Sequence, residues 1–424
     1  MSSRALTVAG RGGANLSLDA ADLRAIVEEA LGDVRAGTRV LAIVPDRTRD
    51  DNTDALFPLA AEVLRRRDAA RLDALVAQGT HPPMSDAAKR EKLGAASGLP
   101  LLEAIFDHQW DVTSELVTLG ELSAPRVAEL TGGLMRASVP VQLNRRLAPG
   151  TYDLVLVFGA TVPHEVAGFA GGAKYFFPGV AGPDLTHMTH WLGALATIER
   201  VIGRVETPTR RMIEAAAALV PTPVISFTSV STRNAGTLRT HALFAGDLVE
   251  TLRRAAAVSA HVHIRYTGRK YRRVVALLDR HYDELWVGGK ASYKLGGIVE
   301  DDGELIIYAP HLTKISTTHG RLIEKYGYAP LEQVREMVEG SDELRANLAV
   351  AAHLAHVSYG SRRTPAGETV ARFRITMASG IPEDVCTRIH LGYLNPRAFD
   401  RRSYENDPNT LVVEDAGRDL YLVQ

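Results

Sequence analysis

Cysteine is almost absent from this chain. Histidine, lysine and arginine are therefore the first residue types to consider as catalytic or ligand-binding groups. The 424 residues include 14 histidines and a single cysteine, Cys386. One cysteine excludes an internal disulfide framework, a CxxC redox pair and a thiolate-rich zinc or iron–sulfur site. A metal in this protein must therefore be held by imidazole and carboxylate groups, or by a cofactor that brings its own ligands.

Asp46, Thr48 and Arg49 follow the first of the predicted buried strands. They offer a carboxylate, a hydroxyl and a guanidinium fork at the expected start of a helix. This combination suits a carboxylate or phosphate ligand, because the free N–H groups of a helix start also favour anions. Simple capping of the helix by Asp51 or Asn52, with surface charge around it, explains the same residues equally well.

His81 follows the second predicted strand, in the stretch Gly79-Thr80-His81-Pro82-Pro83. One glycine and two prolines restrict the backbone around this histidine. A histidine on such a rigid loop can act as base, acid or metal ligand, although a lone histidine is more often structural.

A glycine-rich stretch over 159–179 is the densest group of candidate site residues. These residues are His164, Gly171, Gly172 and Lys174. Glycines let backbone amides approach a ligand closely, and a lysine buried among them can act as a nucleophile or covalent anchor. The stretch is similar to a phosphate-binding loop, but Ala173 and Tyr175 occupy positions where that motif needs glycine and serine or threonine. An enzyme that binds a phosphate or nucleotide through Gly168–Lys174 is one alternative.

Two further pairs of residues are candidates. His187 and His190 are three residues apart, so on a helix they share a face and could chelate a metal. The carboxylate partner of the HExxH class is absent. Tyr293 and Lys294 follow a predicted strand at Glu284–Val287, and are either ligand-binding groups or surface side chains beside a tight turn.

These candidates follow short β-branched runs that alternate with helical stretches. The predicted strands are Thr38–Val44, Arg71–Ala77, Tyr152–Phe158, Val224–Val230, Glu284–Val287, Glu304–Tyr308 and Ala371–Met377. The predicted helices are Leu56–Arg67, Asp86–Leu93, Arg210–Leu219, Asp247–Ala260 and two stretches within Pro330–Val357. Such alternation predicts an α/β fold with mostly parallel sheets. Ligands gather at the carboxyl ends of parallel strands, so the loops after Val44, Ala77, Phe158 and Val287 should carry the site.

We expect two α/β domains with the active-site cleft between them. The N-terminal, cofactor-binding domain should span 1–264, and the C-terminal domain, 265–396, should close the substrate cleft. The tail, 410–424, should return to pack on the first domain. The basic stretch Arg265–Arg273 is the candidate junction, and it reads either as a solvated connector or as an anion-binding patch.

Charge and hydropathy exclude several classes of partner. The chain has 49 Lys and Arg against 50 Asp and Glu, a net charge of -1, which gives no bulk attraction to nucleic acid or acidic membranes. Met1–Ser17 lacks an apolar core of signal-peptide length, and no stretch approaches the roughly 18 apolar residues of a membrane span. We therefore expect a cytoplasmic protein with no nucleic-acid or membrane partner.

Taken together, the loop residues resemble the lactate racemase family, the nickel-pincer-nucleotide 2-hydroxyacid racemases and epimerases. The matching series is Asp46-x-Thr48-Arg49, then Gly79-x-His81, then His164-x9-Lys174 with Gly171-Gly172 between them, and finally His190. The resemblance runs through most of the chain and is strongest from Asp46 to His190.

The resemblance implies a cofactor and its ligands. Lys174 would bond covalently to a nickel-bearing pyridinium mononucleotide, and His190 would be the one protein ligand to nickel. Two sulfurs and a ring carbon of the cofactor would complete the set, which agrees with the scarcity of cysteine. Asp46, Thr48 and the glycine loop would help to seat the nucleotide. Enzymes of cofactor biosynthesis are implied partners.

The resemblance also implies an isomerase mechanism. His81 and His164 would be the acid/base pair on opposite sides of the substrate, and Arg49 would hold its carboxylate. One histidine removes the hydroxyl proton while the Cα hydride moves to the cofactor, leaving a transient 2-keto acid. Return of the hydride to the other face then inverts the carbon.

The second domain departs from the lactate enzymes. There the family pattern has Tyr-Gln and a lysine three residues further on, whereas here Tyr293 is followed directly by Lys294. No tryptophan follows Trp286 to cover a small apolar substrate. These differences favour a polyhydroxylated acid such as an aldonate, with Tyr293 and Lys294 as substrate-binding residues. A non-catalytic protein that binds organic acids is the remaining alternative.

Overall fold

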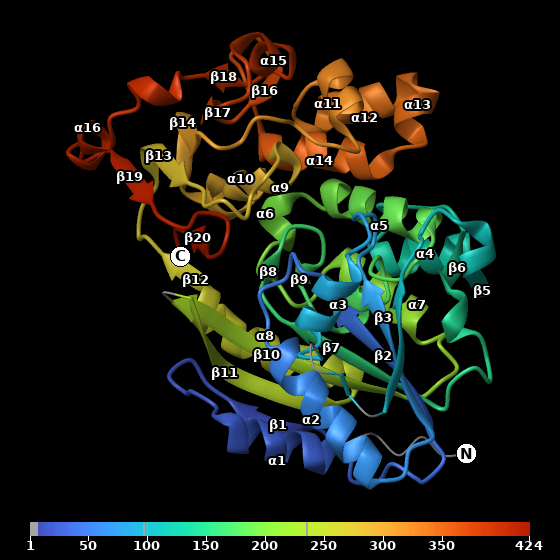
Figure 1. Cartoon of the computed structure of the whole chain (residues 1–424). Coiled ribbons are helices and arrows are strands. Elements are labelled where there is room, and N and C mark those ends of the chain that lie inside the picture. Colours follow the sequence, from blue (N-terminus) through green and yellow to red (C-terminus); the bar gives the residue numbers. More distant parts are fainter. Residues whose placement is uncertain (1–6, 96–97, 100, 235) are drawn as a thin grey trace. The chain divides into compact units, whose positions relative to one another are not determined.

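The computed structural model describes residues 7–95, 98–99, 101–234 and 236–424. The chain forms two compact units, shown in Figure 1. The first unit comprises Met1–Thr189 and Val205–Val262, and the second comprises His190–Arg204 and His263–Gln424. The domain boundaries inferred from sequence, 1–264 and 265–396, stay a prediction.

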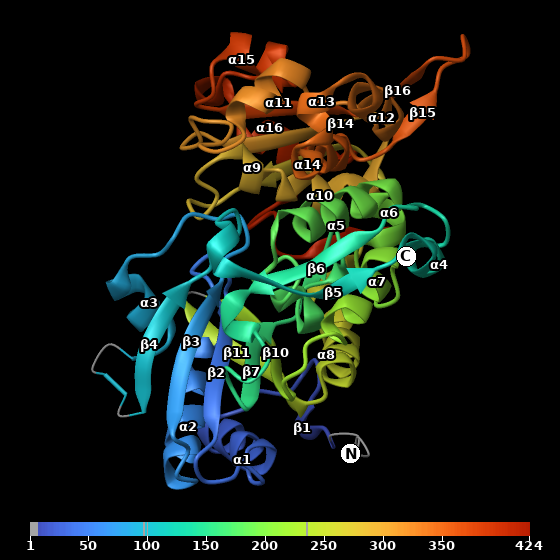
Figure 2. The ribbon, with the colours of Figure 1, turned by 90° about the vertical axis from the view of Figure 1, so that its right-hand side faces the viewer.

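A seven-stranded sheet forms the centre of the first unit. Its order is β1 (Ala9–Gly12), β11 (Thr237–Gly246), β10 (Val224–Asn234), β7 (Leu154–Ala160), β2 (Arg39–Pro45), β3 (Arg71–Ala77) and β4 (Leu102–Asp107). The five strands from β10 to β4 are parallel; β11 pairs antiparallel with β10, and β1 pairs antiparallel with β11. Figure 2 shows β4, β3 and β2 side by side. The predicted α/β fold with mostly parallel sheets is confirmed.

Helices cover both faces of this sheet. On β11, Leu243 and Ala245 pack into one core with α1 (Ala20–Ala30) and α2 (Thr53–Arg66). The alternate residues of β11 pack on α8 (Leu248–His263), as expected when successive side chains point to opposite faces. Burial on both faces explains why the strands read as continuous apolar runs. Further α-helices of this unit are α3 (Asp86–Lys92), α4 (Ala124–Thr131) and α7 (Pro208–Ala217).

Shorter elements complete the first unit and lead into the second. An antiparallel ribbon joins β5 (Leu116–Leu122) to β6 (Val139–Asn144). Helix α5 (Pro183–Leu195) begins in the first unit and ends in the second, where α6 (Ile198–Val201) follows it.

The second unit is built on a five-stranded parallel sheet. Its order is β18 (Gly392–Tyr393), β17 (Arg374–Ser379), β14 (Val299–Ala309), β13 (Tyr271–Leu277) and β19 (Thr410–Val413). Helix α14 (Leu348–Ser358) is its most deeply placed helix, because every residue from Ala349 to Ser358 is buried. Other helices of the unit are α10 (Lys290–Leu295), α11 (Gly320–Tyr326), α12 (Leu331–Gly340), α13 (Asp342–Arg345), α15 (Glu383–Arg388) and α16 (Arg401–Glu405).

The C-terminal tail forms strands in the second unit. Strand β19 lies at the edge of the five-stranded sheet, beside β13. Strand β20 (Leu420–Leu422) pairs in parallel with β12 (Ile264–Tyr266).

One predicted strand is wrong. Residues Glu284–Val287 do not form a strand; Leu285–Gly288 form the short helix α9. Backbone bonds from Leu285 N to Lys314 O and from Trp286 N to Ile315 O, 3.1 and 2.9 Å long, fix this segment. A four-residue apolar run does not distinguish a strand from a buried helical turn, and here tertiary contacts decide.

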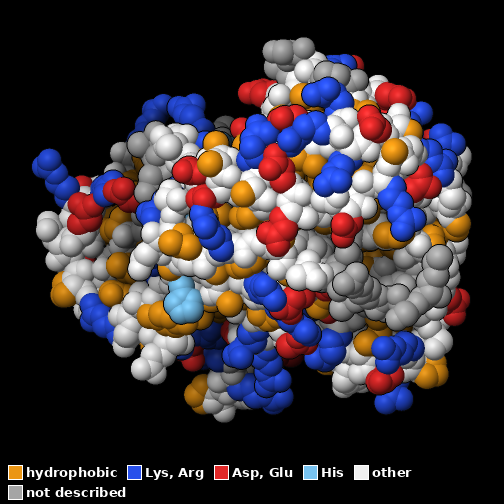
Figure 3. All heavy atoms as spheres, turned by 90° about the horizontal axis from the view of Figure 1, so that it is seen from below, with side chains coloured by type: hydrophobic (Ala, Val, Ile, Leu, Met, Phe, Trp, Pro, Cys, Tyr) orange, Lys and Arg blue, Asp and Glu red, His pale blue; other side chains and the backbone are white. Residues whose placement is uncertain are grey.

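The surface carries both signs of charge. On the face in Figure 3, basic and acidic side chains are interspersed, in keeping with the net charge of -1. None of the helices in the described ranges is long and apolar enough to cross a lipid bilayer.

Candidate active site

Three loops of the first unit meet at the carboxyl edge of its sheet. Asp46 comes directly after β2, and His81 follows β3; their side chains are joined by a bond of 2.6 Å between Oδ2 and Nδ1. The glycine-rich stretch after β7 joins the same group, because Gly79 N donates to Gly179 O over 2.9 Å. The strand order thus brings together residues that are over a hundred positions apart in sequence.

Asp46 is the centre of the first cluster. Its side chain is buried, and Oδ1 accepts hydrogen bonds from Thr48 N and Thr48 Oγ1 at 2.9 and 2.6 Å. Burial alone would raise the pKa of Asp46, but the hydrogen bond and charge of His81, the charge of Arg49 and the Thr48 hydroxyl hold it well below its usual range. Because the ionised Asp46 carboxylate can only accept a hydrogen bond, His81 must carry a proton on Nδ1. In the neutral ring, Nε2 then keeps a lone pair that can act as a base.

Arg49 lies in a loop that is anchored by a lysine. The Lys92 ammonium donates to Arg49 O at 2.8 Å and to the buried Asp51 carboxylate at 2.9 Å. Its neighbour Asp50 pairs with Arg233 at 2.6 Å. These contacts fix the backbone that carries the Arg49 guanidinium next to Asp46.

His164 has the opposite proton assignment. It lies in β8 (Pro163–His164), which pairs with β9 (Gly168–Phe169), and it is 8% exposed. Val166 N donates to His164 Nδ1 at 3.1 Å, whereas Glu165 Oε2 lies 3.5 Å from the same atom. The shorter, directed bond decides the tautomer: Nδ1 is an acceptor, so the neutral ring carries its proton on Nε2.

The backbone of the glycine-rich loop lies close to neighbouring atoms and adopts conformations that favour glycine. Gly171 and Gly172 have φ angles of +99° and +58°, and a Cβ at Gly171 would lie 2.7 Å from Thr161 Oγ1. A side chain at either position is therefore excluded by strain or by space. Lys174 is partly exposed on the short 3-10 turn Gly172–Tyr175 that follows.

Tyr175 explains why this loop differs from a phosphate-binding loop. A Cβ on Gly159 of β7 would lie 2.0 Å from the Tyr175 hydroxyl, so the ring packs directly on the strand. Burial, followed by the charge of Asp51, raises the pKa of Tyr175 above its usual value. A buried, protonated phenol in this position cannot be the small magnesium-binding hydroxyl of that motif.

Arg210 supports the glycine-rich stretch and is not among the residues predicted from the sequence. It lies in α7 and is 1% exposed, and its guanidinium donates to three backbone oxygens of the glycine-rich stretch: Gly171 O at 3.1 Å, Ala167 O at 3.5 Å, and Phe169 O. Burial lowers the pKa of Arg210 to about 10. The signal in the sequence was an arginine on the apolar side of an alanine-rich helix.

Two buried side-chain oxygens that follow strands of this sheet lack a hydrogen-bond partner among the described residues. Gln78 Oε1 and Thr161 Oγ1 have no hydrogen bond within the described chain. Gln78 immediately follows β3 and Thr161 immediately follows β7. Buried polar groups are nearly always satisfied in native proteins, so these two favour a polar ligand at the sheet edge.

The second unit gathers the other predicted residues around His353. Its Nδ1 is 2.7 Å from Tyr293 Oη and its Nε2 is 3.2 Å from Tyr328 Oη. Burial, and then the neighbouring His356, His319 and His190, lower the pKa of His353 well below its usual value. The ring is therefore neutral, and it fixes the Tyr293 hydroxyl.

The surroundings of Lys294 and His187 bear on two interpretations of the sequence, a surface lysine and a metal-binding histidine. Lys294 is 4% exposed, which excludes the surface-lysine interpretation for it. His187 lies edge-on to Trp110, with ring centroids 5.9 Å apart, and burial lowers its pKa. Among the described residues, no group of three or more His, Cys, Asp or Glu side chains could hold a metal ion.

The fold and the site define an α/β protein with an aspartate-oriented histidine, a second buried histidine and a lysine on a glycine-rich loop. Residues 23–201 match the model of the lactate racemase N-terminal domain. This match covers the part of the chain that carries the loops after β2, β3 and β7 and makes it similar to the N-terminal domain of lactate racemases.

Two solved structures are similar over nearly the whole chain. A protein from Thermotoga maritima is 27% identical, with a TM-score of 0.87, and the match covers 97% of this chain and 99% of that one. The lactate racemase apoprotein from Thermoanaerobacterium thermosaccharolyticum is 15% identical, with a TM-score of 0.70 and coverage of 98% and 94%. The latter likeness shows the shared fold. No curated protein matched the sequence significantly.

Proposed function

We propose that this protein is a nickel-pincer-nucleotide-dependent racemase or C2 epimerase of a 2-hydroxy acid. The observation that carries the proposal is the pair of histidines, His81 held by Asp46 and the buried His164, in a chain whose residues 23–201 match the lactate racemase N-terminal domain. Inversion at a carbinol carbon needs a proton acceptor for one stereoisomer and a proton donor for the other. One histidine that starts neutral and one that starts as imidazolium would provide both, so that the proton transfers balance.

His81 would act as the base for one stereoisomer. Asp46 holds its Nδ1–H, so Nε2 can accept the substrate hydroxyl proton, and the ionised carboxylate stabilises the imidazolium that forms. His164 would return a proton to the oxygen of the product from its imidazolium form and end as a neutral imidazole. The roles exchange in the reverse direction, and each histidine should contribute about 10²–10⁴-fold to the rate. Arg49 would bind the substrate carboxylate through its planar fork.

The residues present fit the implied cofactor. A nickel centre that brings its own sulfur and carbon ligands would need only one protein ligand. Lys174 would hold the cofactor covalently and His190 would ligate its nickel. The glycine cradle and the unpartnered Thr161 and Gln78 oxygens fit a polar nucleotide portion. When bound, the cofactor would supply the acceptor for the Cα hydride.

An aldonate or related polyhydroxylated acid is the substrate that we propose. Tyr293 and the buried Lys294 offer hydroxyl and ammonium groups in the second unit, and His353 orients the Tyr293 hydroxyl. Buried polar groups reject a substrate that cannot hydrogen-bond to them, which disfavours lactate.

A substrate screen with the nickel-loaded enzyme tests the proposal. The protein is produced together with the cofactor-synthesis enzymes and offered aldonates and lactate in deuterated water. We expect faster C2 epimerisation of an aldonate than of lactate, with little deuterium incorporated at Cα, and a mass added at Lys174. Lys174→Ala should lose the adduct and the activity, whereas Lys325→Ala, on the surface beside Glu343, should keep both.

Two results would replace this proposal with an alternative. Tight binding of magnesium and ATP, lost on substitution of Lys174, would indicate a nucleotide-binding enzyme. Binding of carboxylates that depends on Arg49, with no epimerisation of any acid by the loaded protein, would indicate an organic-acid-binding protein.

A further inference from the structure

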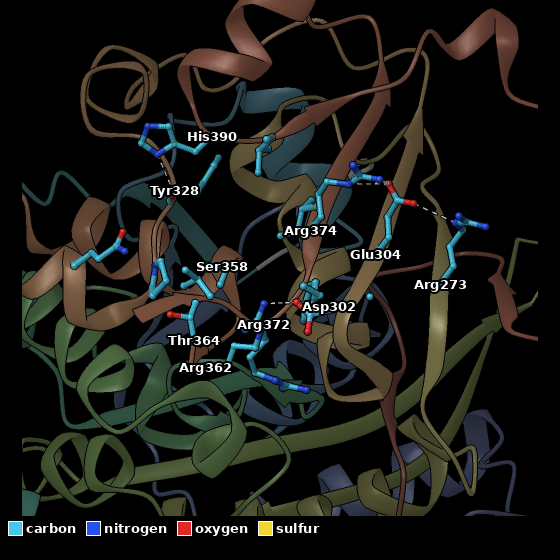
Figure 4. Close-up of a pocket in the computed structure, with 18 of the residues that line it drawn as sticks. Arg273, Asp302, Glu304, Tyr328, Ser358, Arg362, Thr364, Arg372, Arg374 and His390 are labelled. Atoms are coloured by element: carbon cyan, nitrogen blue, oxygen red, sulfur yellow. Dashed lines mark hydrogen bonds and ion pairs between the residues drawn. The ribbon is translucent and has the colours of Figure 1, made fainter. Parts of the chain in front are cut away.

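A pocket in the second unit lies apart from the residues assigned above. It opens at the amino ends of β13, β14 and β17, beside the segment after α14, and its volume is about 810 Å³. Figure 4 shows residues of its lining, which comes from strands, loops and the helices α12 and α14 of this unit. The volume falls within the range of small-molecule sites, about 300–1,000 Å³.

The lining is rich in guanidinium groups. Five arginines line it, namely Arg272, Arg273, Arg362, Arg372 and Arg374. Only two carboxylates, Asp302 and Glu304, line the same pocket. Further carboxylates, those of Asp301, Glu199 and Asp407, contact Arg372 and Arg273 from outside the lining. A ligand inside the pocket thus faces more guanidinium groups than carboxylates.

The two carboxylates of the lining do not occupy all the hydrogen-bond donors of its arginines. Glu304 lies between Arg273 and Arg374, as Figure 4 shows, with contacts of 3.1 and 2.7 Å, so one carboxylate serves two cations. Asp302 pairs with Arg362, and this carboxylate is 60% exposed, so an anion can replace it at small cost.

Two arginines have unused hydrogen-bonding capacity. Arg272 is exposed and forms no ion pair within the described ranges of the chain. The Arg362 Nε atom is buried and has no hydrogen-bond partner among the described residues. Burial of a guanidinium N–H without a hydrogen bond destabilises the folded protein. A bound oxyanion that accepts this hydrogen bond would remove the cost.

We propose that this pocket binds a small organic molecule with at least two phosphate groups, of nucleoside diphosphate or triphosphate size. The arginines flank both sides of the Asp302–Glu304 stretch, so they suit two anionic groups better than one. Arginine binds phosphate oxygens in a bidentate manner. The side chains of Gln333 and Thr364 provide hydrogen-bonding groups for the rest of the ligand.

The pocket is connected to the residues of the second unit described above. Tyr328 lines it, and the Tyr328 hydroxyl contacts His353, whose other nitrogen contacts Tyr293. The site is nonetheless distinct from the glycine-rich loop of the first unit, because none of the lining residues belongs to that unit.

Calorimetry on the purified full-length protein tests the proposal. The probes are pyrophosphate, ATP without magnesium, and orthophosphate, at constant ionic strength. We expect pyrophosphate and ATP to bind at least about 10-fold more tightly than orthophosphate, since a second charge-assisted contact adds to the first. Arg272→Gln, which breaks no ion pair, should weaken binding about 10-fold, and Arg272→Gln with Arg374→Gln should weaken it further.

Two matched controls locate the binding. Arg388→Gln removes an arginine of the same unit that pairs with Asp384 and Glu324 and does not line the pocket, so affinity should not change. Lys174→Ala should also leave affinity unchanged. Absence of pyrophosphate binding at millimolar concentration, equal affinity for orthophosphate, or unchanged binding by a folded Arg272→Gln protein would overturn the proposal.

Discussion

The pairing of Asp46 with His81 shows what residue types alone could and could not indicate. Both residues were candidates from sequence, but Asp46 was assigned to the nucleotide, and its contact with His81 was not anticipated. The two residues are 35 positions apart, and only the neighbouring positions of β2 and β3 in the sheet bring them together. The structure adds to Asp46 the role of orienting His81, whereas its part in seating a nucleotide stays a prediction.

Replacing Asp46 by asparagine should reduce stability in a pH-dependent way. The pKa of Asp46 lies below its unfolded value, so its contribution is present above the unfolded pKa of about 3.9 and is lost as the pH falls. We expect Asp46→Asn to cost about 1–3 kcal/mol at pH 7 and clearly less at about pH 3, below the unfolded pKa, measured by urea unfolding. Asp33→Asn, at an exposed carboxylate, should show no such trend. An equal cost of Asp46→Asn at both pH values would contradict the assignment.

At the scale of elements, the buried strands were the most predictable feature. Arg71–Ala77 was predicted with its observed bounds, and Thr38–Val44 within one residue, because strands buried on both faces are continuous apolar runs. The strand predicted at Glu284–Val287 is wrong for a different reason. A run of so few apolar residues is too short to show the periodicity that distinguishes a strand from a helix. The contacts of Arg210 with the glycine-rich loop were unpredictable, because they depend on how α7 packs on that loop.

Arg210→Lys should loosen the glycine-rich loop. The Arg210 guanidinium donates to three backbone oxygens. The side chain of lysine is shorter and ends in a single ammonium group, which cannot reach all three. We expect a loss of about 2–3 kcal/mol in urea unfolding and faster hydrogen exchange of the amides in 168–175. Arg211→Lys, whose Nε donates only to Leu130 O, should cost about 1 kcal/mol at most. Similar losses in the two variants would show that Arg210 does not hold the loop.

For the whole molecule, the tail is the part whose position the sequence could not settle. The apolar residues of the tail predicted strands, and the structure forms them as β19 and β20. Which sheet a short terminal strand joins depends on partners far away in sequence, and no local pattern encodes that choice. Here β20 pairs with β12, and Leu420 packs close to Gly203, near the end of the His190–Arg204 segment.

Leu420→Ala should therefore destabilise the second unit. Leu420 is fully buried, so its truncation leaves a cavity beside Gly203 and Ile264 and should cost about 2–5 kcal/mol. Hydrogen exchange should accelerate in β12 and in the 190–204 segment, and unfolding by urea should begin at lower concentration. Leu422→Ala, in the same strand but only partly buried, is the matched control and should cost clearly less. Equal losses from the two substitutions, or unchanged exchange in 190–204, would mean that the tail does not anchor the segment that carries His190.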